Sequence, residues 1–215
     1  MSDPGVSDAG VSDPGVSFKV QDHIKPKALT GISDDQIGQH WRLYEGYVKS
    51  ANGLLDGAAK AEPGSPTWAE IKRRLGFEVD GMVLHEYYFA NLAAGSKLSP
   101  GSDLAVDLGA AWGSVGAWRE DFARTGGMRG VGWAILYRDP ATGGLFNWWV
   151  SSHEQGHPAG FNPVLVLDVF EHAWMVDYAA GEKKKYVEAF FENVNWPVVE
   201  QRLRDSKART VPARF

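Results

Sequence analysis

The pattern of apolar residues changes at residues 95–101, a stretch of Gly, Ser, Pro, Lys and Leu that separates two unlike parts of the chain. Before this stretch, apolar and aromatic residues recur every three or four positions, which is typical of helices with one buried face. After it, two apolar runs flank a turn sequence with Asp, Pro and Gly, which is typical of a β-hairpin. A domain boundary is therefore predicted at this stretch.

The first part, residues 29–95, is predicted to be an α-helical hairpin domain. Its first helix is expected to begin after Ser33, because Ser is a preferred N-cap residue. The residues with helical spacing that follow are Ile37, His40, Trp41, Tyr44, Tyr47 and Val48. A segment with Gly, Pro and Ser, residues 52–66, precedes a second helix that is expected to begin at Thr67 and to contain His85.

The second part, residues 102–207, is predicted to be an α/β domain. One or two amphipathic helices are expected over residues 104–125, followed by strands at residues 132–138 and 145–151 with a turn between them. A third strand is expected at residues 164–168, before further helical segments. The predicted fold is therefore α+β, with the helical hairpin domain followed by a domain that has a three-stranded antiparallel sheet.

The N-terminal residues 1–28 are predicted to be a disordered tail. Residues 2–16 repeat a five-residue unit, Ser-Asp-Pro-Gly-Val, with Ala in place of Pro in the middle copy. This composition has too few large apolar groups to form a core.

Charge and hydropathy limit the expected partners of the protein. The formal net charge of −5 argues against nucleic acid. No apolar run reaches the length of about 18 residues that a membrane-spanning helix needs, and the N-terminal residues lack the apolar core of a signal peptide. A cytoplasmic globular protein without a membrane or nucleic-acid partner is therefore expected.

The chain has no Cys, so a transition-metal site would have to use His, Asp and Glu. Three of the six His residues, His40, His85 and His172, lie in aromatic segments, and Asp168 lies four positions before His172. A single His on an apolar helix face is more often a core side chain than a ligand. Three imidazoles and one carboxylate together favour iron or manganese over calcium or magnesium, and zinc is also compatible with them.

Several motifs resemble those of the iron/manganese superoxide dismutase family. Residues 168–173, Asp-Val-Phe-Glu-His-Ala, resemble the family signature D-x-W-E-H-A, and residues 186–203 are similar to its closing segment. The sequence His85-Glu-Tyr-Tyr-Phe resembles the family motif H-x-x-Y-W. The resemblance implies one iron or manganese ion per subunit, superoxide as the substrate, and a homodimer. The implied metal ligands are His40, His85, Asp168 and His172.

The resemblance also implies roles for residues around the metal. Tyr47 corresponds to a Tyr that gates the substrate channel and helps to deliver protons, although it could equally be a packing residue of its helix. Trp133 corresponds to an aromatic wall of the metal pocket, or is a core residue. Glu171 corresponds to a residue that bonds a ligand His across the dimer interface, or is a solvated acid.

The chain differs from the family pattern close to the implied site. His40 and Tyr47 are seven positions apart where the family has eight, so one residue is missing from a helical segment that often contains a π-bulge. Its loss would rotate Tyr47 by roughly 100° relative to His40 unless the helix straightens. The family Gln that bonds the metal-bound solvent is replaced by Gly81 or by Arg129, depending on which of two places it would occupy.

Three side chains are candidates for the contact that this Gln makes in the family. Arg129 could bond the metal-bound solvent and attract superoxide, which makes it a predicted catalytic residue together with Tyr47 and Trp133, or it could turn outward. Gln155 or His157, in the loop before the third strand, could supply the hydrogen bond instead.

Three functions are compatible with these observations. The first is a superoxide dismutase, for which the residues do not decide between iron and manganese. The second is a metal-binding protein of the same fold with altered redox chemistry and little dismutase activity. The third is a scaffold without catalysis, against which the retention of all four implied ligands argues. Dinucleotide binding at residues 126–132 is a weaker idea, because that stretch lacks the pattern G-x-G-x-x-G at a strand-to-helix turn.

Overall fold

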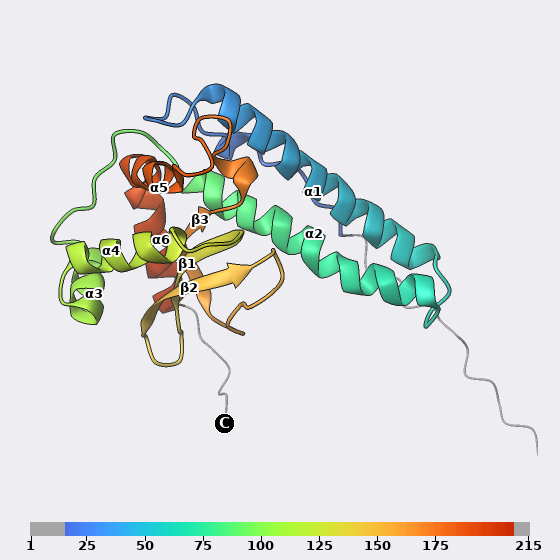
Figure 1. The fold of residues 1–215 in the computed structure, drawn as a ribbon. Coiled ribbons are helices and arrows are strands. Elements are labelled where there is room, and N and C mark those ends of the chain that lie inside the picture. Colours follow the sequence, from blue (N-terminus) through green and yellow to red (C-terminus); the bar gives the residue numbers. More distant parts are fainter. Residues whose placement is uncertain (1–15, 209–215) are drawn as a thin grey trace, which may run out of the picture.

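The structure is a computed structural model that describes residues 16–208. Two long helices, α1 (Asp34–Lys60) and α2 (Pro66–Ala90), form a hairpin that projects from the rest of the molecule (Figure 1). The elements that follow are α3 (Asp103–Trp112), α4 (Val115–Gly126), β1 (Gly132–Arg138), β2 (Leu145–Ser151), β3 (Asn162–Asp168), α5 (Lys183–Glu192) and α6 (Trp196–Ala208). Two short 3₁₀ helices, η1 (Asp22–Ile24) and η2 (Glu171–Ala173), precede α1 and follow β3. Within the described residues, no helix is long and apolar enough to cross a membrane.

The helical hairpin forms where the sequence predicts it, because both helices have capped N-termini. The backbone N–H of Gln36 donates to the Ser33 hydroxyl at 3.0 Å, and that of Trp68 donates to the Ser65 hydroxyl at 3.2 Å. The helix α2 begins at Pro66, one residue before the predicted start, because Pro suits the first position of a helix.

Two helices occupy the region for which the sequence predicts one or two. The helix α3 is followed by Gly113, whose φ of 84° lies in the left-handed region that Gly adopts after helix C-termini. The next residue, Ser114, caps α4 by accepting a hydrogen bond from the backbone N–H of Ala117 at 3.0 Å. One Gly and one Ser therefore divide a segment that could otherwise have been a continuous helix.

The three strands form one antiparallel sheet in the order β2-β1-β3, which confirms the predicted fold class. The strands β1 and β2 have the predicted bounds, whereas β3 begins at Asn162 rather than at Val164. Every residue of the central strand β1 except Arg138 is buried. The pairing of β1 with β3 aligns Trp133 with Asp168, so that two predicted site residues lie side by side.

One hydrophobic core crosses the predicted domain boundary at residues 95–101. Asn91, which follows α2, is buried, and its Oδ1 accepts a hydrogen bond from the backbone N–H of Val166 in β3 at 3.1 Å. The backbone carbonyl of Asn91 accepts a second bond, from the N–H of Asn195, at 2.9 Å. Asn91, the C-cap residue of α2, therefore also attaches the hairpin to the sheet. The division into two domains stays a prediction.

Part of the predicted disordered tail is ordered. Residues 1–15 lie outside the described residues, but residues 16–28 lie against the helical hairpin and include η1. The prediction of disorder through residue 28 is therefore wrong for residues 16–28. The reason is that the chain after the repeat has apolar side chains that pack on the core, namely Phe18, Val20 and Ile24.

Hydrogen bonds from two helices also hold this N-terminal segment in place. The backbone N–H of Phe18 donates to Oδ1 of Asn52 at 2.8 Å, and Nδ2 of Asn52 donates to the carbonyl of Phe18 at 2.9 Å. The N–H of Gln21 donates to the hydroxyl of the buried Tyr44 at 3.0 Å, and that hydroxyl donates to Glu86 at 2.9 Å. The segment is thus bonded to α1 directly and to α2 through Tyr44.

The substitution Asn52→Ala is expected to loosen the N-terminal segment. It removes both bonds to Phe18, so the free energy of unfolding should fall by about 1–2 kcal/mol, and the Phe18 amide should exchange faster with solvent. Urea unfolding and hydrogen-exchange mass spectrometry measure the two effects. Lys49→Ala is the matched control on α1, because Lys49 is an exposed residue of the same helix. Equal stability of wild type and Asn52→Ala would contradict the expectation.

Candidate metal centre

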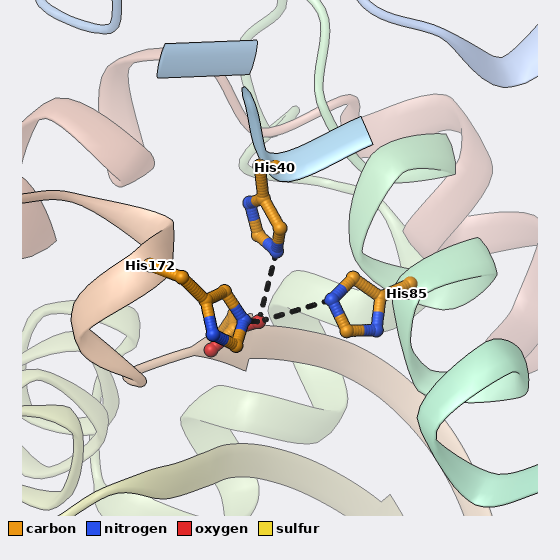
Figure 2. A group of neighbouring side chains, drawn as sticks. His40, His85 and His172 are labelled. Atoms are coloured by element: carbon orange, nitrogen blue, oxygen red, sulfur yellow. Dashed lines mark hydrogen bonds and ion pairs between the residues drawn. The ribbon is translucent and has the colours of Figure 1, made fainter. Parts of the chain in front are cut away.

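The structure brings the four predicted metal ligands together, and we call His40, His85, Asp168 and His172 the ligand cluster. His40 comes from α1, His85 from α2, Asp168 from the end of β3, and His172 from η2. Figure 2 shows the three imidazoles turned toward one point. The Oδ2 atom of Asp168 lies 3.1 Å from Nε2 of His40, 3.2 Å from Nε2 of His172 and 3.7 Å from Nε2 of His85. One potential ligand atom from each residue lies within 4.8 Å of all the others.

Two members of the cluster have a defined hydrogen-bonding state. Nδ1 of His85 donates to the carbonyl of Gly81 at 2.6 Å, since a carbonyl oxygen can only accept. In the neutral ring, Nε2 of His85 then has a free lone pair that points into the cluster, where it is buried and makes no hydrogen bond. Oδ1 of Asp168 accepts from the backbone N–H of Phe170 at 2.8 Å, which leaves Oδ2 to face the three rings. A buried lone pair without a donor is what a metal ligand requires.

The ionisation of the cluster also suits a cation. Burial lowers the pKa of His40 and holds that of His85 well below its usual range, so both rings are neutral at pH 7. Burial by itself would raise the pKa of Asp168, but attraction and hydrogen bonds from His172 and His40 outweigh it and hold this pKa below its usual range. Nitrogen and carboxylate ligands of this kind fit iron or manganese better than calcium or magnesium.

Side chains outside the cluster hold the backbone of two ligands. The hydroxyl of Tyr186 donates to the carbonyl of Asp168 at 2.8 Å, and the hydroxyl of Tyr88 lies 3.1 Å from that of Tyr186. Nε2 of the buried Gln36 donates to the carbonyl of His172 at 2.7 Å, and its Oε1 accepts from the N–H of Val176 at 2.9 Å. Because Gln36 lies one turn before His40 on α1, it holds the η2 ligand against the helix that supplies the first one.

Tyr47 lies on the face of α1 that meets the cluster. The helix is regular from Asp34 to Lys60, so the straightened alternative considered from the sequence is the one observed. The seven-residue step from His40 to Tyr47 turns the helix to within about 20° of two full turns, so both side chains lie on the same face. The Tyr47 ring lies 5.1 Å from the ring of His85. Gly81 makes room for it, because a Cβ atom there would lie only 2.7 Å from Cδ1 of Tyr47.

His153, in the loop after β2, is a site residue that the sequence analysis missed. Its Nδ1 accepts from Nε1 of the buried Trp133 at 3.1 Å, and its Nε2 lies 2.7 Å from the hydroxyl of Tyr47. Since the indole N–H can only donate, a neutral His153 has its hydrogen on Nε2 and donates it to Tyr47. Burial lowers the pKa of His153 to about 4, which keeps this state at pH 7. The sequence signal for His153 was only its position two residues after a strand.

Two aromatic residues lie next to the cluster. The Trp133 ring lies 5.2 Å from the ring of His85. Phe170, which stands where the family signature has Trp, stacks between His153 at 4.8 Å and His172 at 5.1 Å. Phe170 therefore packs one face of the His172 ring against the imidazole that bonds Tyr47.

The three side chains that the sequence offered for the missing Gln contact, Arg129, Gln155 and His157, do not reach the cluster. Arg129 is exposed in the loop before β1, and within residues 16–208 no hydrogen bond or ion pair joins it to the cluster. This loop is held at the surface by Lys183, whose ammonium group donates to the carbonyls of Met128 and Gly130 at 2.9 and 3.0 Å. The structure therefore gives no support to the predicted catalytic role of Arg129.

The loop between β2 and β3 also turns Gln155 and His157 away from the cluster. Gln155 is exposed, and its backbone carbonyl accepts from the N–H of Ser151 at 3.0 Å. His157 has both ring nitrogens in hydrogen bonds elsewhere, one to Tyr137 and one to the backbone of His153. Neither side chain supplies the hydrogen bond that the sequence analysis considered for it.

Comparisons of the sequence with known proteins identify relatives of the chain. Residues 100–202 match the family described as iron/manganese superoxide dismutases, C-terminal domain. An iron superoxide dismutase of Aquifex aeolicus (strain VF5) is 35% identical over 192 residues, which is 85% of the chain and 89% of the relative. Iron superoxide dismutases of Cupriavidus metallidurans and Saccharolobus solfataricus are both 34% identical, over 178 and 182 residues. Each covers 80% of the chain, and the matches span 88% and 86% of these relatives.

The metal-free protein is expected to lose stability as the pH falls below about 6.5, the pKa of an unfolded His. Because the pKa values of buried His40, His85 and His153 are lowered, the unfolded state binds more protons there than the folded state. The free energy of unfolding should then fall by up to about 1.4 kcal/mol per pH unit for each of these residues. Asp168, whose pKa is also lowered, adds a loss only below about pH 3.9.

Urea unfolding at about pH 7.5 and about pH 5.5, on either side of this pKa, measures the effect. The variant His85→Asn should have a smaller pH slope than the wild type, because it removes one of the three His residues whose pKa values are lowered. A free energy of unfolding that stays constant or rises between the two pH values would contradict the expectation.

Proposed function

The chain belongs to the iron/manganese superoxide dismutase family, and from this membership we propose that its ligand cluster binds one redox-active iron ion and dismutates superoxide. In the overall reaction two superoxide anions and two protons give one O₂ and one hydrogen peroxide. The convergence of three imidazole Nε2 atoms and one carboxylate oxygen on a single buried point supports the proposal. The chemistry that a bound ion supplies is one-electron transfer between its trivalent and divalent states.

The charges of the ligand cluster favour such a cycle. Asp168 is the only anionic member, and it favours the more highly charged metal state, whereas the neutral rings of His40 and His85 do not add to that preference. The reduction potential therefore depends on the one carboxylate and on the hydrogen bonds around the site.

Tyr47 and His153 can hold a proton next to the cluster. Burial raises the pKa of Tyr47 to about 12, so its phenol keeps its hydrogen at pH 7. Because Nε2 of His153 donates to the Tyr47 oxygen, that hydroxyl is free to donate its own hydrogen to a further acceptor. We assign to this pair the delivery of protons to the reduced substrate, and to Trp133 the positioning of His153.

Iron is proposed over manganese because the relatives described above are named as iron enzymes. The second possibility from the sequence, a metal-binding protein with little dismutase activity, keeps one observation in its favour. The family Gln is absent, and a His makes the contact to Tyr47 in this chain. Cytoplasmic residence and the lack of a nucleic-acid partner stay predictions from the sequence.

Removing one ligand tests the site and the activity together. Purified His85→Ala should retain little iron. Its rate of superoxide consumption should fall by more than the factor of about 10 to 100 that is typical when a hydrogen-bond partner of a metal ligand is removed. Metal is measured by mass spectrometry and activity by superoxide consumption in the same sample. His23→Ala, in the exposed η1, is the matched control. A wild-type protein with stoichiometric iron and no activity would instead favour the metal-binding alternative.

We further propose a homodimer formed over the groove next to η2. This groove is lined by Gln39, Arg42, Leu43, Glu171, His172, Met175 and Val176. Three of these residues expose large apolar side chains, with Leu43 41%, Met175 46% and Val176 42% accessible. The imidazole of His172 is 23% accessible there, and the resemblance implies that Glu171 bonds a ligand His of a second subunit. A symmetric dimer would place each Glu171 over the other subunit's groove.

A charge in the groove is expected to separate the subunits. The substitution Met175→Glu would bury two carboxylates at a two-fold interface, so the mass measured by light scattering should change from dimer to monomer. Val106→Glu on α3 is the control, because Val106 is 60% exposed and lies outside the groove. A wild-type mass of one chain, or a Met175→Glu dimer as stable as the wild type, would exclude this interface.

A further inference from the structure

The loop between β2 and β3 contains two histidines, and only His153 faces the site. His157 lies four residues later, and both of its ring nitrogens are bonded inside the protein. Its Nε2 lies 2.6 Å from the backbone carbonyl of His153, and its Nδ1 lies 2.7 Å from the hydroxyl of Tyr137. His157 therefore connects the backbone of His153 to the strand β1.

The direction of both hydrogen bonds follows from the partners. A carbonyl oxygen can only accept, so Nε2 of His157 donates to His153. In the neutral ring Nδ1 then accepts, and the hydroxyl of Tyr137 donates to it. The bridge runs in one direction, from Tyr137 through His157 to the His153 carbonyl.

Tyr137 is a rigid anchor for this bridge. It belongs to the central strand β1, is 2% exposed, and is paired with Phe146 of β2 and Pro163 of β3. The same strand contains Trp133, whose indole N–H bonds the ring of His153. One strand thus holds His153 at two points, its ring through Trp133 and its backbone through His157.

The loop needs such a hold because it turns sharply. Ser152 has a φ of 56°, in the left-handed region that a residue other than Gly rarely adopts. His153 follows it directly, and its ring has to meet Trp133 and Tyr47 at the same time, at 3.1 and 2.7 Å. A small rotation of the His153 peptide would lengthen at least one of these two bonds.

We propose that His157 is a positioning residue for the reaction, which holds the backbone of His153 so that its ring bonds Trp133 and Tyr47 together. The effect on the reaction rests on the proposed dismutase function, whereas the positioning of His153 does not. His157 is not a proton relay, because its link to His153 ends on a carbonyl oxygen, which has no proton to pass on. It acts through geometry alone.

The test compares His157→Leu, which removes both bonds, with His157→Gln, whose amide can donate to His153 and accept from Tyr137. In the full-length metal-loaded protein, His157→Leu should lower kcat/KM by about 3- to 10-fold, less than the about 10- to 100-fold typical of groups that bond a ligand directly. The loss should appear in kcat rather than in KM. The reduction potential of the bound metal should differ from that of the wild type, whereas the metal content should be the same. His157→Gln should restore both the rate and the potential.

Hydrogen exchange in the same proteins gives a measurement that does not depend on activity. Amides in residues 151–157 should exchange faster in His157→Leu and at the wild-type rate in His157→Gln. Tyr137→Phe removes the anchor bond alone, and it should shift exchange and kcat in the direction of His157→Leu even if the Leu variant folds poorly. His23→Leu in η1 is the control, for which no change is expected.

Two outcomes separate the inference from the function on which its effect depends. Wild-type exchange rates and an unchanged potential in both His157→Leu and Tyr137→Phe would overturn the positioning role, whatever the activity of the protein. Faster exchange in these variants together with a wild-type protein that consumes no superoxide would overturn the dismutase function and leave the positioning of His153 in place. Loss of kcat that His157→Gln does not restore would overturn the proposed bridge.

Discussion

The structure depends on one buried carboxylate. Oδ2 of Asp168 lies at the centre of three imidazole rings, with no exposed surface of its own. A buried charge of this kind is costly unless it is matched by partners in a fixed geometry. The hairpin supplies two rings and the loop after β3 supplies the third, so a metal ion in this place would join both parts of the chain.

The residues around the cluster act mainly by holding backbone. Gln36 bonds the carbonyl of His172, Tyr186 bonds that of Asp168, and Gly81 accepts the bond that orients His85. His157 bonds the carbonyl of His153 in the same manner. The side chains of the cluster and His153 are thus placed by neighbours outside the cluster, which is how ligand geometry and reduction potential are set in metal sites.

The sequence predicted local features well because their causes are local. Ser33 and Ser65 cap the hairpin helices, and Gly113 divides α3 from α4. The bounds of β1 and β2 follow from apolar runs that end at a turn. The predicted disordered tail was extended too far along the chain, because the repeat on which that prediction rests ends before Phe18 and the apolar residues beyond it were not separated from it.

The four members of the ligand cluster were predictable as neighbours, because residue type and motif spacing identify them without a structure. His153 and Arg129 were not, because the sequence does not state which side of a loop faces the site. The positive φ of Ser152 and the bonds of His157 and Trp133 turn His153 inward, whereas Arg129 lies exposed on a loop that Lys183 binds. The shortened step from His40 to Tyr47 likewise had two possible outcomes; the helix is regular, and Gly81 leaves the space that Tyr47 occupies in it.

The sequence by itself determined the elements and the family, and it predicted the ligand set, since these depend on spacing, capping and residue chemistry along the chain. Only the tertiary structure decided which side chain bonds Tyr47 and how that side chain is held. The reason is that contacts between α1, α2, β1 and the loop after β2 place this side chain. These contacts join residues far apart in the sequence, such as Tyr47 and His153, which are 106 positions apart.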